Sequence, residues 1–318
     1  MLSDAERTAT REPTRRSVGL AFAAGTALIS GCAVFVNGYG VRAWREVASA
    51  TTYTTVKNAV AALILIALAV GLTRSGSREG LRRPEGTRQW LGVAAVAIVG
   101  GSIPFALFFE GFARASSSQA AFIHKTLVVW VVILAVVFLR ERIGWLHVAA
   151  VALLVWGQAT LLGGIGELAI GSGEFMMLGA TLLWSVEVVV AKKLLSSVSP
   201  MTLAVARMAG GAVLLIAYGI VSGASVSFAA LGMSHILWVL LTGLVLAAYV
   251  GTWYSALARA QAVDVTAVLV GGALVTAALN VGIRDLAVPP VAGLVLVGCG
   301  VVLAGVALAS RQRPIRIR

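Results

Sequence analysis

Residues 49–72 read SATTYTTVKNAVAALILIALAVGL, a run of helix length with a single charged side chain, Lys57. A helix needs about 20 apolar residues to cross a bilayer, and only a continuous helix satisfies its own backbone groups in hydrocarbon. This run therefore predicts a membrane-spanning α-helix. Similar runs recur along the chain, and the sequence predicts spans at 18–40, 49–72, 89–111, 115–139, 144–163, 173–191, 201–222, 236–257, 263–282 and 288–309.

The composition fits a protein whose main solvent is lipid. Of the 318 residues, 59% are hydrophobic and 12% are charged, whereas soluble domains carry about 25% charged residues. The net charge of +12 lies in connectors and tails rather than in one stripe, which argues against nucleic-acid binding. Cys32 and Cys299 lie in apolar segments without metal-ligand spacing, and no phosphate-binding or catalytic motif is present, so neither a cofactor nor a catalytic residue is predicted.

The basic residues in the connectors predict the orientation, because short cytoplasmic loops are rich in Lys and Arg. With the N-terminus inside, eighteen of the 25 lysines and arginines fall in inner segments, four in outer connectors and three within spans. This asymmetry favours an even number of spans with both tails, 1–17 and 310–318, in the cytoplasm.

A weak internal repeat relates the two halves of the chain. FARASSSQAAF at 112–122 resembles LARAQAVDVTA at 257–267, and TYTTVKNAVAALIL at 52–65 resembles TLAVARMAGGAVLL at 202–215. The offset corresponds to five spans, and an odd number inverts the second copy. We therefore predict an all-α membrane protein of ten transmembrane helices, arranged as two inverted five-helix repeats at 18–163 and 173–309. Inverted repeats are typical of secondary transporters.

These features resemble the EamA-domain proteins of the drug/metabolite transporter superfamily. The resemblance rests on the ARASSSQAA stretch, on LRERI at 139–143 with Glu141 closing the fourth span, and on WSVEVVVAKKLL at 184–195. Asp285 stands where the family would place a second glutamate. The resemblance implies a transporter of amino acids, drugs, sugars or other metabolites, commonly an exporter.

Ionisable side chains deep in a membrane are costly, so each is a candidate for function. From the rise along a helix, Lys57, His124 and Lys125 are all expected near mid-membrane. The lysines are candidates to bind a carboxylate or phosphate, and His124 to sense or pass a proton. The alternative for the lysines is snorkelling or binding of backbone carbonyls. Three aromatic residues are expected to wall the same pocket: Trp130, Trp184 and Tyr249.

Glu110, Glu187 and Arg207 are candidates for proton coupling or charge pairing. A glutamate paired with a lysine would neutralise a buried charge and leave a group that titrates during transport. Each also has a structural alternative: Glu110 reaching the outer interface, Glu187 pairing with Lys192 or Lys193, and Arg207 reaching water at the inner face.

The favoured function is secondary active transport, by alternating access, of a small anionic or zwitterionic metabolite, in the export direction and with proton coupling as one option. The alternative is an integral membrane enzyme that acts on a lipid-linked substrate. The expected location is the plasma or inner membrane, and the expected partners are lipid and a small-molecule substrate. Substrate identity and oligomeric state stay open.

Overall fold

The computed structural model describes residues 4–77, 79–112, 114, 122–161, 171–224, 226, 228–284 and 290–309. Within these residues the chain is helical, and extended backbone pairs only in one bridge between Ala48 and Val226. Eight helical segments are long and apolar enough to cross a membrane, and two shorter apolar helices, Trp145–Leu161 and Val291–Ala307, accompany them. The all-helical, multi-pass fold is therefore confirmed, while the count of ten spans stays a prediction.

The helices follow the predicted spans closely. The first half holds α1 (Asp4–Trp44), α2 (Ala50–Arg74), α3 (Gly86–Gly101), α4 (Ile103–Phe112), α6 (Leu127–Leu134), the π-helix η1 (Ala135–Leu139) and α7 (Trp145–Leu161). The second half holds α8 (Ser172–Leu194), α9 (Pro200–Val205), the π-helix η2 (Ala206–Gly210), α10 (Gly211–Val221), the short 3₁₀ helix η3 (Phe228–Ala230), α11 (Met233–Leu257), α12 (Ala262–Val270), α13 (Gly272–Arg284) and α14 (Val291–Ala309).

Local sequence explains where two of these helices begin. The Ser49 hydroxyl accepts a hydrogen bond from the Thr52 backbone N–H at 3.1 Å and so caps α2. Ser199 caps α9 in the same way, with Pro200 at the first helical position. Helix α1 differs from the sequence prediction, because it begins at Asp4 rather than near residue 18. Extending a helix that has already nucleated adds one hydrogen bond per residue fixed, so the helix continues into the predicted tail, while its apolar span begins at Ser17.

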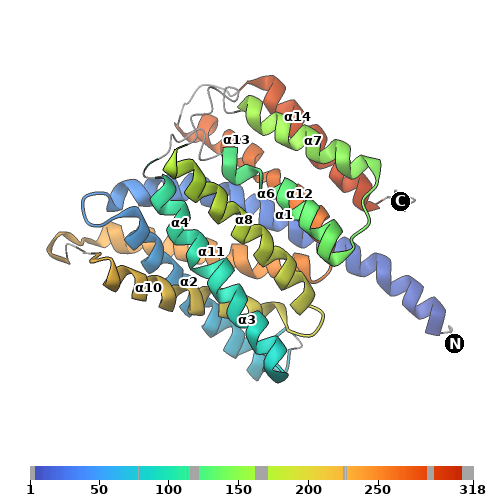
Figure 1. Cartoon of the computed structure of the whole chain (residues 1–318), viewed down its shortest axis with the longest axis horizontal. Helices are drawn as coiled ribbons and strands as arrows, with labels where there is room; N and C mark the ends of the chain where they lie inside the picture. Colours follow the sequence, from blue (N-terminus) through green and yellow to red (C-terminus); the bar gives the residue numbers. More distant parts are fainter. Residues whose placement is uncertain are drawn as a thin grey trace.

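The helix packing repeats between the two halves. Helix α1 packs against α11, and its counterpart α8 packs against α3 and α4. Helix α2 also packs against α11, while its counterpart, formed by η2 and α10, packs against α3. The fifth segment of each half, α7 and α14, lie side by side along one edge of the bundle (Figure 1). This correspondence agrees with the repeat in the sequence.

Helix α1 begins and α14 ends at the same end of the bundle (Figure 1), which we call the terminus end. Several contacts close this end. Lys192 donates to the carbonyl of Leu257 at 2.6 Å, the Ser199 hydroxyl donates to the carbonyl of Gly80 at 2.8 Å, and Arg259 pairs with Glu79. The contacts of Ser199 and Arg259 tie connections of the two halves together at the terminus end.

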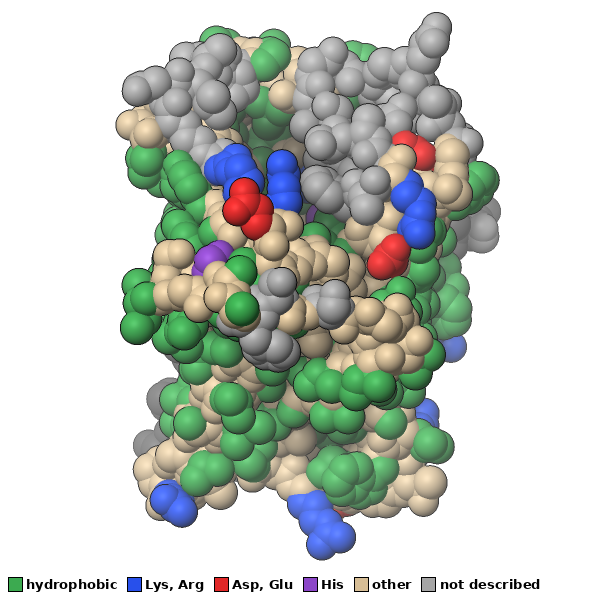
Figure 2. All heavy atoms as spheres, turned by 90° about the vertical axis from the view of Figure 1, so that its left-hand side faces the viewer, with side chains coloured by type: hydrophobic (Ala, Val, Ile, Leu, Met, Phe, Trp, Pro, Cys, Tyr) green, Lys and Arg blue, Asp and Glu red, His purple; other side chains and the backbone are tan. Residues whose placement is uncertain are grey.

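The outer surface of the bundle is suited to lipid. Large apolar side chains are exposed on many helices, including Leu91, Trp156 and Ile220 at 66%, 70% and 76% exposure. Figure 2 views the left-hand side of Figure 1, the end opposite the termini, where basic and acidic side chains form small mixed groups among apolar side chains and tan polar and backbone atoms. The apolar side chains exposed along the helices require lipid hydrocarbon as their solvent.

Candidate functional site

A cavity of about 240 Å³ lies between the two halves of the bundle. Both halves contribute to its wall, which includes side chains of α1, α4, α8, η2, α11 and α12 together with the segment that precedes α6. Six predicted site residues line it: His124, Lys125, Trp184, Glu187, Arg207 and Tyr249. The cavity is small compared with the ~300–1,000 Å³ of pockets for drug-sized ligands, so its volume fits a small metabolite.

Lys125 and His124 are neighbours in sequence, yet both side chains reach the cavity. The helix is interrupted by a turn at Thr126, whose hydroxyl donates to the carbonyl of Ile123 at 2.6 Å. The Lys125 ammonium makes no hydrogen bond or ion pair with any described residue, and the buried His124 Nδ1 has no hydrogen-bond partner among them. These two groups are therefore available to a ligand in the cavity.

Aromatic rings form much of the cavity wall. The Trp184 ring lies edge-on to His124 and to Phe105, with centroid distances of 5.1 and 5.3 Å. On the opposite helix α11, Tyr249 and Trp253 stack with an interplanar angle of 10°. Aromatic faces supply a rigid apolar lining, so a ligand here contacts rings as well as charges.

A buried charged cluster completes the wall. The Glu187 carboxylate accepts a hydrogen bond from the Tyr254 hydroxyl at 2.5 Å and lies 3.8 Å from Arg207 Nη1. Arg207 Nε also donates to the carbonyl of Gly100 at 3.3 Å. Glu187 and Arg207 are 1% and 7% exposed. A buried charge is costly when it is isolated, so each side chain stabilises the other by offsetting its charge.

Two glycines bring Arg207 to this position. A Cβ on Gly101 would collide with the backbone carbonyl of Arg207 and lie 2.9 Å from the Cα of Gly211. Helix α3 and the η2–α10 segment therefore approach to backbone contact, as small residues permit in membrane bundles. Residue 207 itself lies in the π-helix η2, a distortion often found at functional sites.

Lys57 lies next to the cavity rather than in its wall. It is 6% exposed, and its ammonium donates to Asn37 Oδ1 at 3.1 Å, while Asn37 itself lines the cavity. The two lysines that the sequence places at one level are thus not equivalent. Lys125 lines the cavity, whereas Lys57 lies behind its wall and hydrogen-bonds to the lining residue Asn37.

The structure places two predicted residues away from the cavity. The Trp130 indole N–H donates to the Thr126 hydroxyl at 3.1 Å, and Glu110 forms an exposed ion pair with Arg114 at 3.2 Å. Glu110 is thus paired with Arg114 outside the cavity, and its place at the outer interface stays a prediction. Glu187 pairs with Arg207 rather than with Lys192 or Lys193, and Arg207 is buried rather than in contact with water.

Sequence reasoning missed three residues that shape the site: Asn37, Phe105 and Tyr254. Asn37 is a polar residue inside the first span, a signal that could have been used. Phe105 and Tyr254 have no such signal, because aromatic residues occur on every face of membrane helices. Asp285 and the ARASSSQAA stretch at 113–121 lie outside the described residues, apart from Arg114.

The chemistry of the cavity favours an anion. Its wall carries two cations, Lys125 and Arg207, and one anion, Glu187, with Lys57 held just behind it. Arg207 and Glu187 offset each other, which leaves the Lys125 ammonium as the charge that a ligand can neutralise. A carboxylate or phosphate beside an apolar or aromatic body matches this lining.

Comparisons with known proteins agree with the fold. The model of a family described as the EamA-like transporter family matches residues 17–163 and again 171–309. A solved structure, titled only as the crystal structure of a protein, is similar over 94% of this chain and 97% of its own, with a TM-score of 0.73 and 18% sequence identity. At that identity the likeness shows the shared fold alone. The search of curated proteins found no match.

Proposed function

The chain belongs to the EamA-like transporter family, and from this premise we propose that it is a secondary active transporter of a small anionic or zwitterionic metabolite. The observation that carries the proposal is the unpaired ammonium of Lys125, which faces a cavity between the two halves with no partner among the described residues. A buried cation in a membrane is costly unless an anion joins it, and a substrate carboxylate or phosphate supplies that anion.

Alternating access between the two repeats is the mechanism that we propose. The cavity lies at the interface of the halves, where transporters with inverted repeats bind their substrates. Rocking of one half against the other would close one end of the bundle and open the other around the same residues. The repeated helix packing supports this motion, because the two halves offer equivalent contacts for both states.

The orientation and direction belong to the same proposal. We place the terminus end in the cytoplasm of a plasma or inner membrane, on the strength of the Lys and Arg asymmetry between the connectors. We propose export, because members of the family are commonly exporters, with proton coupling as one option. The membrane-enzyme alternative has no supporting observation among the described residues.

The test is solute uptake into proteoliposomes from a library of organic anions and zwitterions, with and without a pH gradient. Wild type is compared with Lys125→Ala, with the charge-preserving Lys125→Arg, and with Lys193→Ala as a matched control at an exposed lysine on α8. Losing a hydrogen bond to a charged group costs about 1.5–3 kcal/mol, which corresponds to about a 10- to 100-fold loss of apparent affinity.

We expect that loss in Lys125→Ala, partial recovery in Lys125→Arg and wild-type uptake in the control. Unchanged uptake of an anion by Lys125→Ala would show that this site does not bind the substrate. If no solute moves under any gradient while the purified protein modifies a lipid substrate, the transporter proposal fails in favour of the enzyme.

A further inference from the structure

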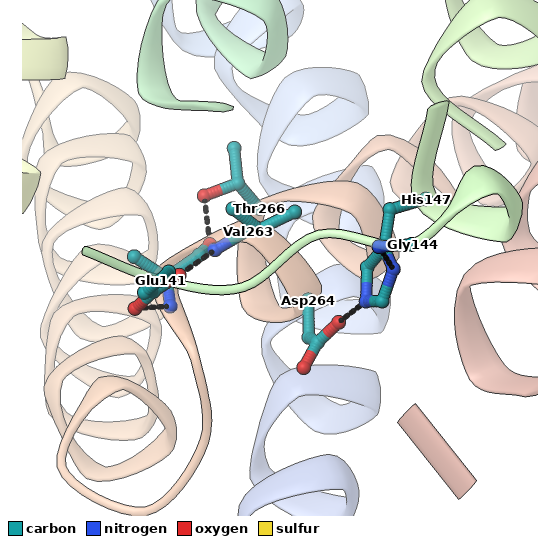
Figure 3. Close-up of polar contacts among 7 residues, drawn as sticks. Glu141, Gly144, His147, Val263, Asp264 and Thr266 are labelled. Carbon is teal, nitrogen blue, oxygen red and sulfur yellow. Dashed lines mark hydrogen bonds and ion pairs between the residues drawn. The ribbon is translucent and has the colours of Figure 1, made fainter. Parts of the chain in front are cut away.

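A second polar cluster lies at the terminus end, outside the cavity. It joins the connection between η1 and α7 to the start of α12 (Figure 3). Three ionisable residues form it: Glu141 in the connection, His147 on α7 and Asp264 on α12. His147 and Asp264 are 8% and 2% exposed, so their contact is a buried link between the two halves of the protein.

Glu141 holds the beginning of α12. Its carboxylate accepts hydrogen bonds from the backbone N–H groups of Ala262 and Val263 at 2.8 and 3.1 Å (Figure 3). These N–H groups belong to the first turn of a helix, where they have no partner within the helix and where a negative charge is favoured. The first half of the chain thus fixes the position of α12 in the second half.

The protonation state of His147 in this closed arrangement follows from its contacts. The backbone N–H of Gly144 donates to His147 Nδ1 at 3.0 Å, so Nδ1 carries no proton. The ring proton is on Nε2, which lies 3.2 Å from the Asp264 carboxylate and donates to it. His147 is therefore neutral, and its pair with Asp264 carries one negative charge.

Binding of a further proton to His147 is incompatible with this geometry. The proton would attach to Nδ1 and convert the acceptor of the Gly144 N–H bond into a second donor. Two donors would then face each other across 3.0 Å, so the ring or the connection must move. The Gly144 bond anchors the connection that carries Glu141, so its loss frees this connection to withdraw Glu141 from the first turn of α12, while the imidazolium stays paired with Asp264.

The other charged groups around His147 do not reproduce this response. Within the described residues, α14 has no charged side chain, α12 supplies Asp264, and the connection supplies Glu141 with the exposed Arg140 and Arg142. Lys192 of α8 acts on Glu141. Burial raises the pKa of the Glu141 carboxyl above its ordinary value, so protonation of Glu141 favours the buried, closed position. Lowering the pH therefore stabilises the closed arrangement through Glu141, whereas it destabilises that arrangement through His147.

The cluster is directly connected to the cavity. Thr266, Leu269 and Val270 of α12 line the cavity, and the Thr266 hydroxyl donates to the carbonyl of Ala262 at 2.7 Å. Moving the start of α12 therefore moves one wall of the substrate site. We propose that His147 and Asp264 form a proton-binding site, and that a proton taken up there from the terminus side opens that end of the cavity. As a coupling site it rests on the proposed transport function.

The experiment measures access to the terminus end and needs no substrate. Ala260, 5% exposed in the connection before α12, is replaced by cysteine as a reporter, in the full chain with Cys32→Ala and Cys299→Ala. Its rate of maleimide labelling in nanodiscs is divided by that of a Ser196→Cys control, because position 196 is exposed at the same end. The ratio removes the intrinsic pH dependence of thiol labelling.

The ratio is followed from about pH 7.5 to about pH 5.5, the range around the ordinary imidazole pKa of about 6.5. We expect it to rise as the pH falls, by up to about tenfold per pH unit, the limit for opening controlled by one proton. His147→Gln keeps an N–H donor for Asp264 but cannot bind the proton, so its ratio should stay flat. Glu141→Gln keeps a carbonyl acceptor for α12 and removes the opposing titration of Glu141, so we expect the baseline to stay low and the pH response to be retained.

Asp264→Asn provides a second test that does not depend on the folding of the His147 variant. It keeps an acceptor for Nε2 but removes the negative charge, so the midpoint of the response should move to lower pH. A flat wild-type ratio, an equal response in His147→Gln, or an unshifted midpoint in Asp264→Asn would each overturn the proposal. Proteoliposome uptake is measured separately, so failure of the proton site is distinguishable from failure of transport.

Discussion

Removing the buried cation Arg207 should destabilise the protein far more than its size suggests. In Arg207→Met the Glu187 carboxylate, 1% exposed, loses its partner at 3.8 Å. Breaking a buried ion pair by removing one partner costs about 3–5 kcal/mol, because the remaining charge is left uncompensated. Methionine retains most of the apolar volume, so the loss is assigned to charge rather than to a cavity.

The double variant Arg207→Met/Glu187→Met separates the two contributions. With both charges gone, the main remaining cost is the Tyr254 hydroxyl, which loses its acceptor at 2.5 Å, an unsatisfied buried group that costs about 1–3 kcal/mol. The double variant should therefore be more stable than Arg207→Met by about 2 kcal/mol, the difference between the middles of these two ranges.

The assay is equilibrium unfolding of purified protein in mixed micelles, comparing wild type, both single variants and the double variant. A double variant whose loss of stability equals or exceeds the sum of the single losses would refute the reasoning. In that case the pair contributes through packing, and its charges are not coupled.

Three further predictions concern other contacts. Gly101→Ala should lower the free energy of unfolding by about 1–3 kcal/mol, the usual range for overpacking, because the added Cβ meets backbone atoms of η2 and α10. Thermal unfolding checks this against the control Gly298→Ala, where a Cβ meets nothing within 4 Å. Tyr254→Phe should cost about 1.5–3 kcal/mol in the same assay, since the lost hydrogen bond is to the charged Glu187. Burial raises the pKa of the Glu141 carboxyl in the folded protein, so the folded state favours the protonated form. The resulting contribution to the free energy of unfolding is complete below the unfolded pKa and is lost as pH rises through the folded pKa. Wild type should therefore lose stability relative to Glu141→Gln as pH rises above about 4.5, and unfolding measured over that range checks the sign.

The sequence predicted the fold well because the bilayer imposes strong local requirements. The span predicted at 49–72 is helix α2 at 50–74, and the span predicted at 236–257 is helix α11 at 233–257. Hydrophobic length decides such segments whatever their neighbours are. The family follows from the same pattern, since both repeats match one family model.

The sequence by itself determined that three basic side chains lie within long apolar helices, but not what each of them contacts. Lys57, Lys125 and Arg207 were identified from their positions in spans, yet the first binds Asn37, the second faces the cavity, and the third pairs with Glu187. Only the tertiary structure decided these partners. Hydrophobicity is a property of each segment alone, whereas the partner of a buried charge depends on how helices distant in the sequence rotate and approach one another. The contact between Gly101 and η2, and the link from His147 to Asp264, arise from that packing.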